Sequence, residues 1–276
     1  MAQYQRKLGH TVVVIMPDGH DGYKQKAYYG IQFVGPRRRA FAHFGILRKP
    51  LAFAFLVFTR LYFYFYVAWV ARLYDVVHIH SVYAVSLLLP FKPKIIEFHG
   101  DEIRNYPNLH GKLYRFVLRL FLWLHWKTTF YVPTPDLLSE LRHVVCIPIP
   151  VNIELFSRVL PPVMGTALYM HNWHEKNYDR ALLLAKKYNL RLKIVDRTFP
   201  SNNLNYVNMP RLMERYEYLI DRGVIKSLST TAYEALALGL KVIAYDDEVL
   251  TELPSEHLPW NVAAQTIEIY HEVMKD

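Results

Sequence analysis

The chain has 276 residues, of which 52% are hydrophobic and 21% charged. That composition excludes an intrinsically disordered protein, and the length allows one large domain or two small ones. The single cysteine, Cys146, excludes an internal disulfide, and the apolar run around it, residues 144–149, predicts a buried strand rather than a nucleophile. Residues 1–8 lack the apolar core of a signal peptide, so we expect a cytoplasmic protein.

The net charge of +9 is unevenly divided between the two halves of the chain. Residues 1–150 carry 19 Lys and Arg against 8 Asp and Glu, whereas residues 151–276 carry 14 against 16. A basic half indicates an anionic partner or simply a solvated basic surface. Its basic residues are interleaved with aliphatic and aromatic ones and match no nucleic-acid-binding module, so we expect an anionic membrane surface and no nucleic acid.

Apolar runs separated by helical stretches recur through the first half. The expected strands are residues 10–16, 30–35, 75–80, 94–99 and 129–133. Continuous rather than alternating apolar strands are typical of a parallel sheet that helices cover on both faces. We therefore predict an α/β doubly wound domain over residues 1–150.

Two helical stretches of this half are unusually apolar. Residues 51–71 are long enough to span a bilayer, but a central Arg60 and a position between two strands of one sheet argue against spanning. Residues 112–127 form an amphipathic pattern in which basic side chains lie beside Trp123 and Phe116. That pattern favours a helix at a membrane interface, the alternative for both stretches being helices packed on the sheet.

A proline-rich hinge at residues 147–151 separates the halves, and the same alternation then resumes. The expected elements are strands at 167–170, 191–195, 205–207 and 241–245, with a helix at 179–188. We predict a second domain over residues 151–276, whose last helix packs back on the first. Two such domains leave a cleft, and ligands bind at the carboxyl ends of the strands.

Several motifs occur in an order that resembles the retaining family 4 glycosyltransferases (glycosyl transferases group 1). They are DVVHIH at 75–80, IEFHGD at 96–101, VPTPD at 132–136, IPIPVN at 147–152, HEKN at 174–177 and SLSTTAYEALALG at 227–239. The resemblance implies a GT-B fold: two Rossmann-like doubly wound domains facing a cleft, with the nucleotide-sugar site in the C-terminal one. It also implies transfer of a sugar to a hydroxyl acceptor with retention of configuration.

The donor site that the resemblance implies lies after the hinge. Lys176 is the expected cation of a diphosphate-binding loop, and His171 stands where the family has a basic residue. Ser229 and Thr230 open a helix, where hydroxyls and free N–H groups cap the helix or bind a phosphate. Glu234 is the expected partner of the ribose hydroxyls, and Gly239 is the expected closing residue of the helix. The donor is a substrate, and we expect no cofactor.

On the acceptor side, the resemblance makes His99 the residue closest to the reacting centre and Asp101 a residue that orients the sugar or the acceptor. His99 follows an apolar strand and precedes a glycine, as expected for a strand end at the cleft. His78 and His80 alternate on the preceding strand, where a structural role is expected. These histidines show no convincing ligand pattern, so we expect no metal site.

Some features depart from the family pattern. The family's first strand and glycine-rich turn have no counterpart before residue 9, and Lys226 replaces the first of a pair of glutamates. These departures leave open a non-catalytic binding or scaffold protein, and a sugar-nucleotide epimerase or hydrolase shares the same architecture. The expected function is nonetheless a nucleotide-sugar-dependent glycosyltransferase, peripheral on the inner face of the membrane if its acceptor is lipid-linked.

Overall fold

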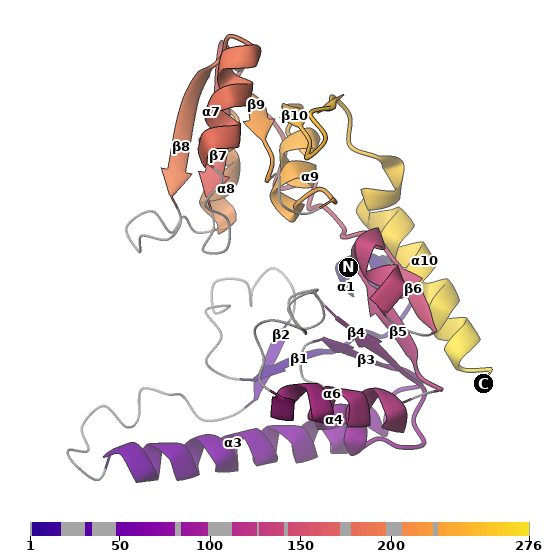
Figure 1. Cartoon of the computed structure of the whole chain (residues 1–276). Coiled ribbons are helices and arrows are strands. Elements are labelled where there is room, and N and C mark those ends of the chain that lie inside the picture. The colour runs from indigo at the N-terminus through magenta and orange to yellow at the C-terminus, as the bar shows by residue number, and fades with distance from the viewer. Residues whose placement is uncertain are drawn as a thin grey trace. The chain divides into compact units, whose positions relative to one another are not determined.

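The structure is a computed structural model that describes residues 2–17, 31–34, 48–80, 84–98, 112–125, 127–140, 143–171, 178–196, 206–222 and 226–275. The chain divides into two compact units (Figure 1). Unit 1 comprises residues 1–133, 137–147 and 263–276, and unit 2 comprises residues 134–136 and 148–262. Each unit is described by itself.

Unit 1 contains a four-stranded sheet in the order β3-β4-β5-β6, all parallel. Its strands are Val77–His80 (β3), Lys94–Glu97 (β4), Thr129–Val132 (β5) and Val144–Cys146 (β6). Two further strands, Val14–Pro17 (β1) and Ile31–Val34 (β2), pair in parallel with each other. The five predicted strands of the first half are therefore present, but the first two form a ladder separate from the sheet.

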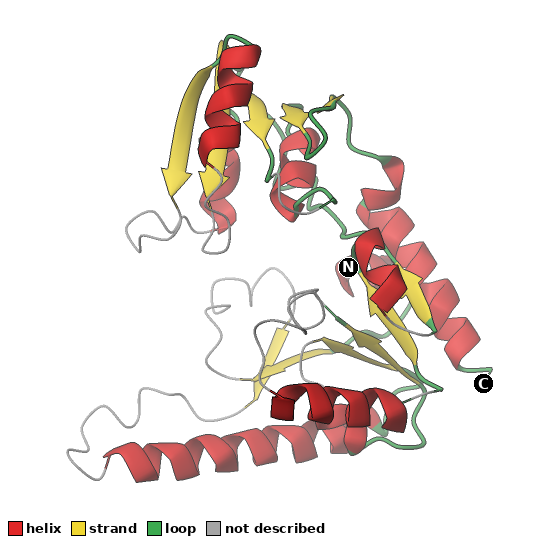
Figure 2. Ribbon diagram, in the orientation of Figure 1, coloured by secondary structure: helices red, strands yellow, loops and turns green. Residues whose placement is uncertain are grey.

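Helices cover both faces of the unit 1 sheet (Figure 2). Ile79, Ile96 and Phe130 belong to one core cluster with side chains of helices α3 (Arg48–Ala71), α4 (Ala84–Leu87) and α6 (Lys112–Leu124). Alternate residues of a strand point to opposite faces, so these helices lie on one face. The opposite face carries His78, which hydrogen-bonds Tyr270 of helix α10 (Pro259–Val273). The short N-terminal helix α1 (Ala2–Lys7) also reaches Tyr270, through Gln5.

Unit 2 contains a five-stranded sheet in the order β11-β10-β9-β7-β8. Its strands are Val163–His171 (β7), Arg191–Asp196 (β8), Tyr216–Ile220 (β9), Lys241–Ile243 (β10) and Val249–Leu250 (β11). The first four are parallel, and β11 pairs antiparallel with β10. The chain passes from β7 to β8 on one side and then returns to β9 on the other, so the strand order reverses between β7 and β9.

The unit 2 sheet is also covered twice. Ala167, Tyr169 and Ile220 pack with helix α7 (Tyr178–Lys187), whereas Leu168 and Leu219 pack with helices α8 (Met209–Met213) and α9 (Thr230–Ala237). Both described sheets thus have the parallel, doubly covered character that the apolar runs predict. The connections that the structure describes include the 3₁₀ helices η3 (Pro135–Glu140), η5 (Tyr206–Asn208) and η6 (Ser255–His257).

One predicted strand is wrong, and two strands, β9 and the two-residue β11, are missing from the prediction. Residues 206–208 form η5, and Pro210 lies in the first turn of the helix that follows. Proline suits a helix start because it lacks the N–H that would be unbonded there. The longer missed strand is the central β9, whose Glu217 interrupts the apolar pattern. That carboxylate is nevertheless buried, because it accepts a hydrogen bond from the Gly165 N–H and pairs with Lys241.

The predicted helices at 51–71 and 112–127 are both present as α3 and α6. No helix in the described part of the chain combines the length and the apolar character needed to cross a membrane. Both helices instead pack one side against the unit 1 core.

Candidate functional site

The carboxyl edge of the unit 2 sheet brings together residues that are distant in sequence. His171 is the last residue of β7 and aligns with Asp196 at the end of β8. Asp221 follows β9 directly, and Tyr169 of β7 aligns with Ile220 of β9. This edge lies where the strand order reverses, which is where open parallel sheets bind their ligands.

Helix α9 begins at the same edge and is capped by Ser229. The Ser229 hydroxyl accepts a hydrogen bond from the Ala232 N–H at 3.1 Å, which is the usual bond of an N-cap residue. The same hydroxyl donates to the carboxylate of Asp221, and the Ser229 N–H donates to the other oxygen of that carboxylate at 2.9 Å. The cap is therefore tied to the end of β9, which fixes the helix start against the sheet edge.

The far end of α9 is fixed by Gly239. This glycine has φ +75, and its N–H donates to the Leu236 carbonyl at 2.8 Å while the Leu240 N–H donates to the Ala235 carbonyl at 2.9 Å. A left-handed glycine with these two bonds ends a helix in a Schellman motif. The sequence predicts Gly239 as the closing residue, and this is confirmed.

Asp221 was not predicted as a site residue. Burial raises the pKa of its carboxyl group, and the hydrogen bonds from Ser229 act in the opposite direction. Arg180 of α7 donates to the Asp221 carbonyl at 3.0 Å, also to the Ala244 carbonyl, and to the Asp247 carboxylate at 2.9 Å. Arg180 thus holds the ends of β9 and β10 together. An aspartate directly after an apolar strand was the available signal, but it required β9 to be recognised.

Several donors for an anionic ligand lie at the start of α9. Within the described residues, the N–H groups of Thr230 and Thr231 have no hydrogen-bond partner, as expected for the first turn of a helix. The hydroxyl of Ser227 is buried and also has no partner within the described residues. Helix N-termini with free N–H groups are suited to phosphates.

The predicted donor-site residues fall into different environments. Thr230 is exposed at the helix start, whereas Glu234, one turn further along α9, is buried at 5% exposure. The backbone of His171 lies at the sheet edge, but its side chain is outside the description. Lys176, His99 and Asp101 lie outside the described residues. The structure therefore brings His171, Ser229 and Thr230 to one edge of unit 2 and leaves the other positions as predictions.

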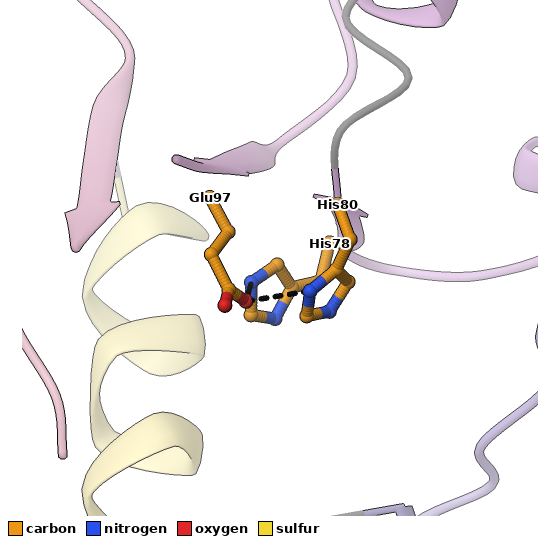
Figure 3. A group of neighbouring side chains, drawn as sticks. All are labelled: His78, His80 and Glu97. Carbon is orange, nitrogen blue, oxygen red and sulfur yellow. Dashed lines mark ion pairs between the residues drawn. The ribbon is translucent and has the colours of Figure 1, made fainter. Parts of the chain in front are cut away.

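A second polar group lies at the carboxyl ends of β3 and β4 in unit 1 (Figure 3). His80 aligns with Glu97 across the strand pair, and His78 lies two residues earlier on the same face. Glu97 Oε2 is 2.6 Å from His80 Nδ1 and 3.2 Å from His78 Nε2. The sequence predicts a structural role for both histidines, but His80 is the last residue of β3 and its side chain is 55% exposed. Glu97 was missed, although a glutamate inside the apolar run 94–98 was a visible signal.

Burial alone would raise the pKa of the Glu97 carboxyl group. The hydrogen bonds from His78 and His80 outweigh that effect and hold the pKa of Glu97 well below its usual range. Glu97 is therefore an ionised carboxylate at neutral pH. The His78 Nδ1 atom shares a 2.9 Å hydrogen bond with the Tyr270 hydroxyl on α10.

The helices on the other face of unit 1 expose large apolar side chains. On α3 they follow one stripe, Phe58, Leu61, Tyr62, Phe65 and Trp69, and on α6 they are Phe116, Val117, Leu120, Trp123 and Leu124. Trp69 is 61% exposed and Trp123 69% exposed. We call these ten residues the apolar helical face. A surface of this kind is typical of contact with a membrane or with another protein.

Three comparisons with known proteins bear on the family. The model of Glycosyltransferase Family 4 matches residues 1–154. No curated protein matches the chain. Among solved structures, sucrose-phosphate synthase from Thermosynechococcus elongatus is similar with a TM-score of 0.41 and 14% identity over 73% of this chain. The match spans 66% of that chain, which is just under two thirds of its length. Because the family model covers more than half of the sequence, the chain belongs to Glycosyltransferase Family 4.

Proposed function

We propose that this protein transfers a sugar from a nucleotide-sugar donor to a hydroxyl acceptor and binds the donor at the carboxyl edge of the unit 2 sheet. The observation that carries the proposal is the meeting of His171, Asp221 and the start of α9 at the point where the strand order reverses. The two units are the halves of a GT-B architecture in this proposal. Family membership supports retention of configuration.

The proposed diphosphate site is the first turn of α9. The N–H groups of Thr230 and Thr231 and the hydroxyl of Ser227 provide donors for phosphate oxygens. The Ser229 proton is already committed to Asp221, so Ser229 positions the helix rather than donating to the ligand. In the proposal Lys176 and His171 supply positive charge for the diphosphate, and Glu234 accepts hydrogen bonds from the ribose.

Catalysis in this proposal rests on positioning and on stabilising the nucleoside diphosphate as it leaves. Developing negative charge on a leaving group is stabilised by helix N–H groups and cations that are already in place. His99 and Asp101 of unit 1 contact the donor sugar and orient the acceptor. No covalent nucleophile is required of the chain, and no metal or other cofactor takes part in the proposed transfer.

The apolar helical face supports an acceptor at a membrane surface. It is exposed on the half of the chain with a net charge of +11, and Arg119 and Lys127 are exposed on or beside α6. Amphipathic helices with Trp and Phe on one side and basic residues on the other bind anionic interfaces. The protein is therefore peripheral on the cytoplasmic side of a membrane in this proposal, with a lipid-linked acceptor.

A ligand screen tests the proposed donor site. Purified protein is titrated by calorimetry, with thermal shift in parallel, against UDP, GDP, ADP and their common sugar conjugates. One nucleotide is expected to bind saturably, and Lys176→Ala and Glu234→Gln are each expected to weaken it about tenfold or more because each removes a charged hydrogen-bond partner.

Lys186→Ala is the matched control, because Lys186 is an exposed lysine of α7 away from the sheet edge. Its affinity should equal that of the wild type. The melting temperature of each variant without ligand shows whether the fold is kept. If no nucleotide binds a folded wild-type protein, the transferase proposal is wrong and a non-catalytic binding role takes its place.

A further inference from the structure

The group formed by His78, His80 and Glu97 in unit 1 plays no part in the proposed donor site. Its ligand-type atoms, one from each side chain, lie within 4.8 Å of one another. Two strands that are fixed by backbone pairing supply them, since His80 aligns with Glu97 in the parallel ladder of β3 and β4. The group is therefore held by the sheet rather than by a loop.

We propose that His78, His80 and Glu97 form a binding site for one divalent transition-metal ion, with Zn²⁺ the best match to the ligand set. Two imidazoles and one carboxylate are a usual set of three protein ligands for zinc, and the fourth position is then taken by water or a substrate. The proposed metal site uses residues of unit 1 alone, so its test does not depend on whether the donor site in unit 2 binds a nucleotide.

The distances are close to those of a metal site. Ligand atoms bound tetrahedrally to Zn²⁺ at about 2.0–2.1 Å lie about 3.3 Å apart. The separation of His78 Nε2 from Glu97 Oε2 is 3.2 Å, and that of His80 Nδ1 from the same oxygen is 2.6 Å. The His78–Glu97 separation already matches that spacing, and the His80–Glu97 separation would lengthen by about 0.7 Å when an ion binds.

Tyr270 provides an outer-shell hydrogen bond of the kind that orients histidine ligands. Its hydroxyl is 2.9 Å from His78 Nδ1, the ring nitrogen that does not face Glu97. In the metal-bound form Nδ1–H donates to the Tyr270 oxygen, which leaves the Nε2 lone pair for the ion.

The three side chains differ in solvent exposure, and the most exposed of them leaves a path for an ion from solvent. Glu97 is 7% exposed and His78 12% exposed, whereas His80 is 55% exposed. The ion would reach the buried carboxylate past the exposed imidazole. Because the histidines must be neutral to bind it, binding releases protons and the affinity rises with pH.

Titration of the full-length protein with ZnSO₄ and with CoCl₂ tests the proposal. Calorimetry is expected to give one Zn²⁺ per chain, and Co²⁺ is expected to give visible absorption bands of a tetrahedral complex. His80→Ala should lower the zinc affinity by more than about 100-fold, whereas Tyr270→Phe should lower it by about 10–100-fold, the usual effect of losing an outer-shell partner.

His80→Ala is the decisive variant because its side chain is more than half exposed and its removal leaves the core intact. His271→Ala is the control, since His271 is an exposed histidine of α10 outside the group, and it should bind zinc like the wild type. Circular dichroism and the metal-free melting temperature verify that each variant is folded. Absence of saturable zinc binding by the wild type, or unchanged binding by folded His80→Ala, would overturn the proposal.

Discussion

The two units place polar side chains at the same kind of sheet edge, but they use different partners. In unit 2 the Asp221 carboxylate accepts hydrogen bonds from the hydroxyl and the N–H of Ser229, and this fixes the start of a helix. In unit 1 the Glu97 carboxylate contacts the imidazoles of His78 and His80. A carboxylate among hydroxyl and N–H groups positions an anion site, whereas a carboxylate among imidazoles resembles a metal site. In the two proposals, the neighbours that the strand ends supply decide whether such an edge binds an anion or a metal ion.

The helices that cover the two sheets differ as well. In unit 1, α3 and α6 expose the ten side chains of the apolar helical face, whereas in unit 2 α7 exposes Leu182 and Leu183 and α9 exposes no large hydrophobic side chain. This contrast agrees with the charge difference between the halves of the sequence. It assigns contact with a membrane surface to unit 1 and nucleotide binding to unit 2 in the proposed function.

The largest expected effects test whether the units are separate cooperative bodies. Ile96 and Leu168 are fully buried in the cores of unit 1 and unit 2, respectively. Ile96→Ala and Leu168→Ala should each cost about 2–5 kcal/mol by leaving a cavity. Calorimetric unfolding should show each variant lowering a different transition. A single transition lowered equally by both variants would show that the two units unfold as one cooperative body.

The Asp221 cluster is expected to contribute less than a core residue. Asp221→Ala leaves the Ser229 N–H unbonded at a buried site and should cost about 1–3 kcal/mol. Ser229→Ala removes the N-cap hydroxyl and should cost about 1 kcal/mol. Urea unfolding should show that the double variant loses less free energy of unfolding than the two single variants lose together, because the two residues share hydrogen bonds. Strict additivity would show that the bonds between Asp221 and Ser229 do not stabilise unit 2.

Two carboxylates of unit 2 should respond oppositely to acid. Burial raises the pKa of Asp221, so protonation stabilises the folded state as pH falls through that raised value. The advantage of wild type over Asp221→Asn should therefore grow on acidification, by at most about 1.4 kcal/mol per pH unit. The hydrogen bond from the Gly165 N–H lowers the pKa of Glu217, so its contribution persists at neutral pH and is lost only as pH falls below about 4.3.

Urea unfolding of the wild type, Asp221→Asn and Glu217→Gln between pH 7 and pH 3.5 measures both slopes. As pH falls, the difference in free energy of unfolding between the wild type and Asp221→Asn should widen. The difference between the wild type and Glu217→Gln should stay level and then narrow. Parallel slopes for the two variants would mean that burial does not dominate at Asp221.

The smallest expected effect concerns the surface of unit 1. Arg119 is exposed on α6 beside the apolar helical face, and one basic residue near an anionic bilayer contributes about 1 kcal/mol. Arg119→Gln should therefore lower the affinity for vesicles of anionic phospholipid about fivefold. Lys193→Gln, at an exposed lysine of unit 2, should leave vesicle binding unchanged. Equal loss in both variants would indicate attraction by net charge alone.

Much of the fold could be predicted from the sequence because the buried strands of a parallel sheet appear as continuous apolar runs. The strands at 75–80, 94–99 and 191–195 and the helix at 179–188 were predicted within a few residues. β9 was missed because Glu217 breaks its pattern, and only the tertiary partners Gly165 and Lys241 explain that buried charge. The predicted strand at 205–207 failed because the proline three residues later favours a helix start.

The candidate sites were predicted less completely than the fold. Ser229 and Gly239 could be identified because capping is a local property of sequence. Asp221 and Glu97 could not, because each acquires its role from a residue on another element. His80 lies opposite Glu97 because of the register in which β3 pairs with β4, and no local sequence pattern predicts that register.

Hydrogen–deuterium exchange with the nucleoside diphosphate selected by the ligand screen tests the proposed donor site most directly. We expect slower exchange at the start of α9, residues 227–234, and at the end of β7, and we expect the nucleotide alone to leave the exchange of β3 and β4 in unit 1 unchanged. Protection confined to unit 1, or unchanged exchange at the start of α9 in the bound protein, would contradict it.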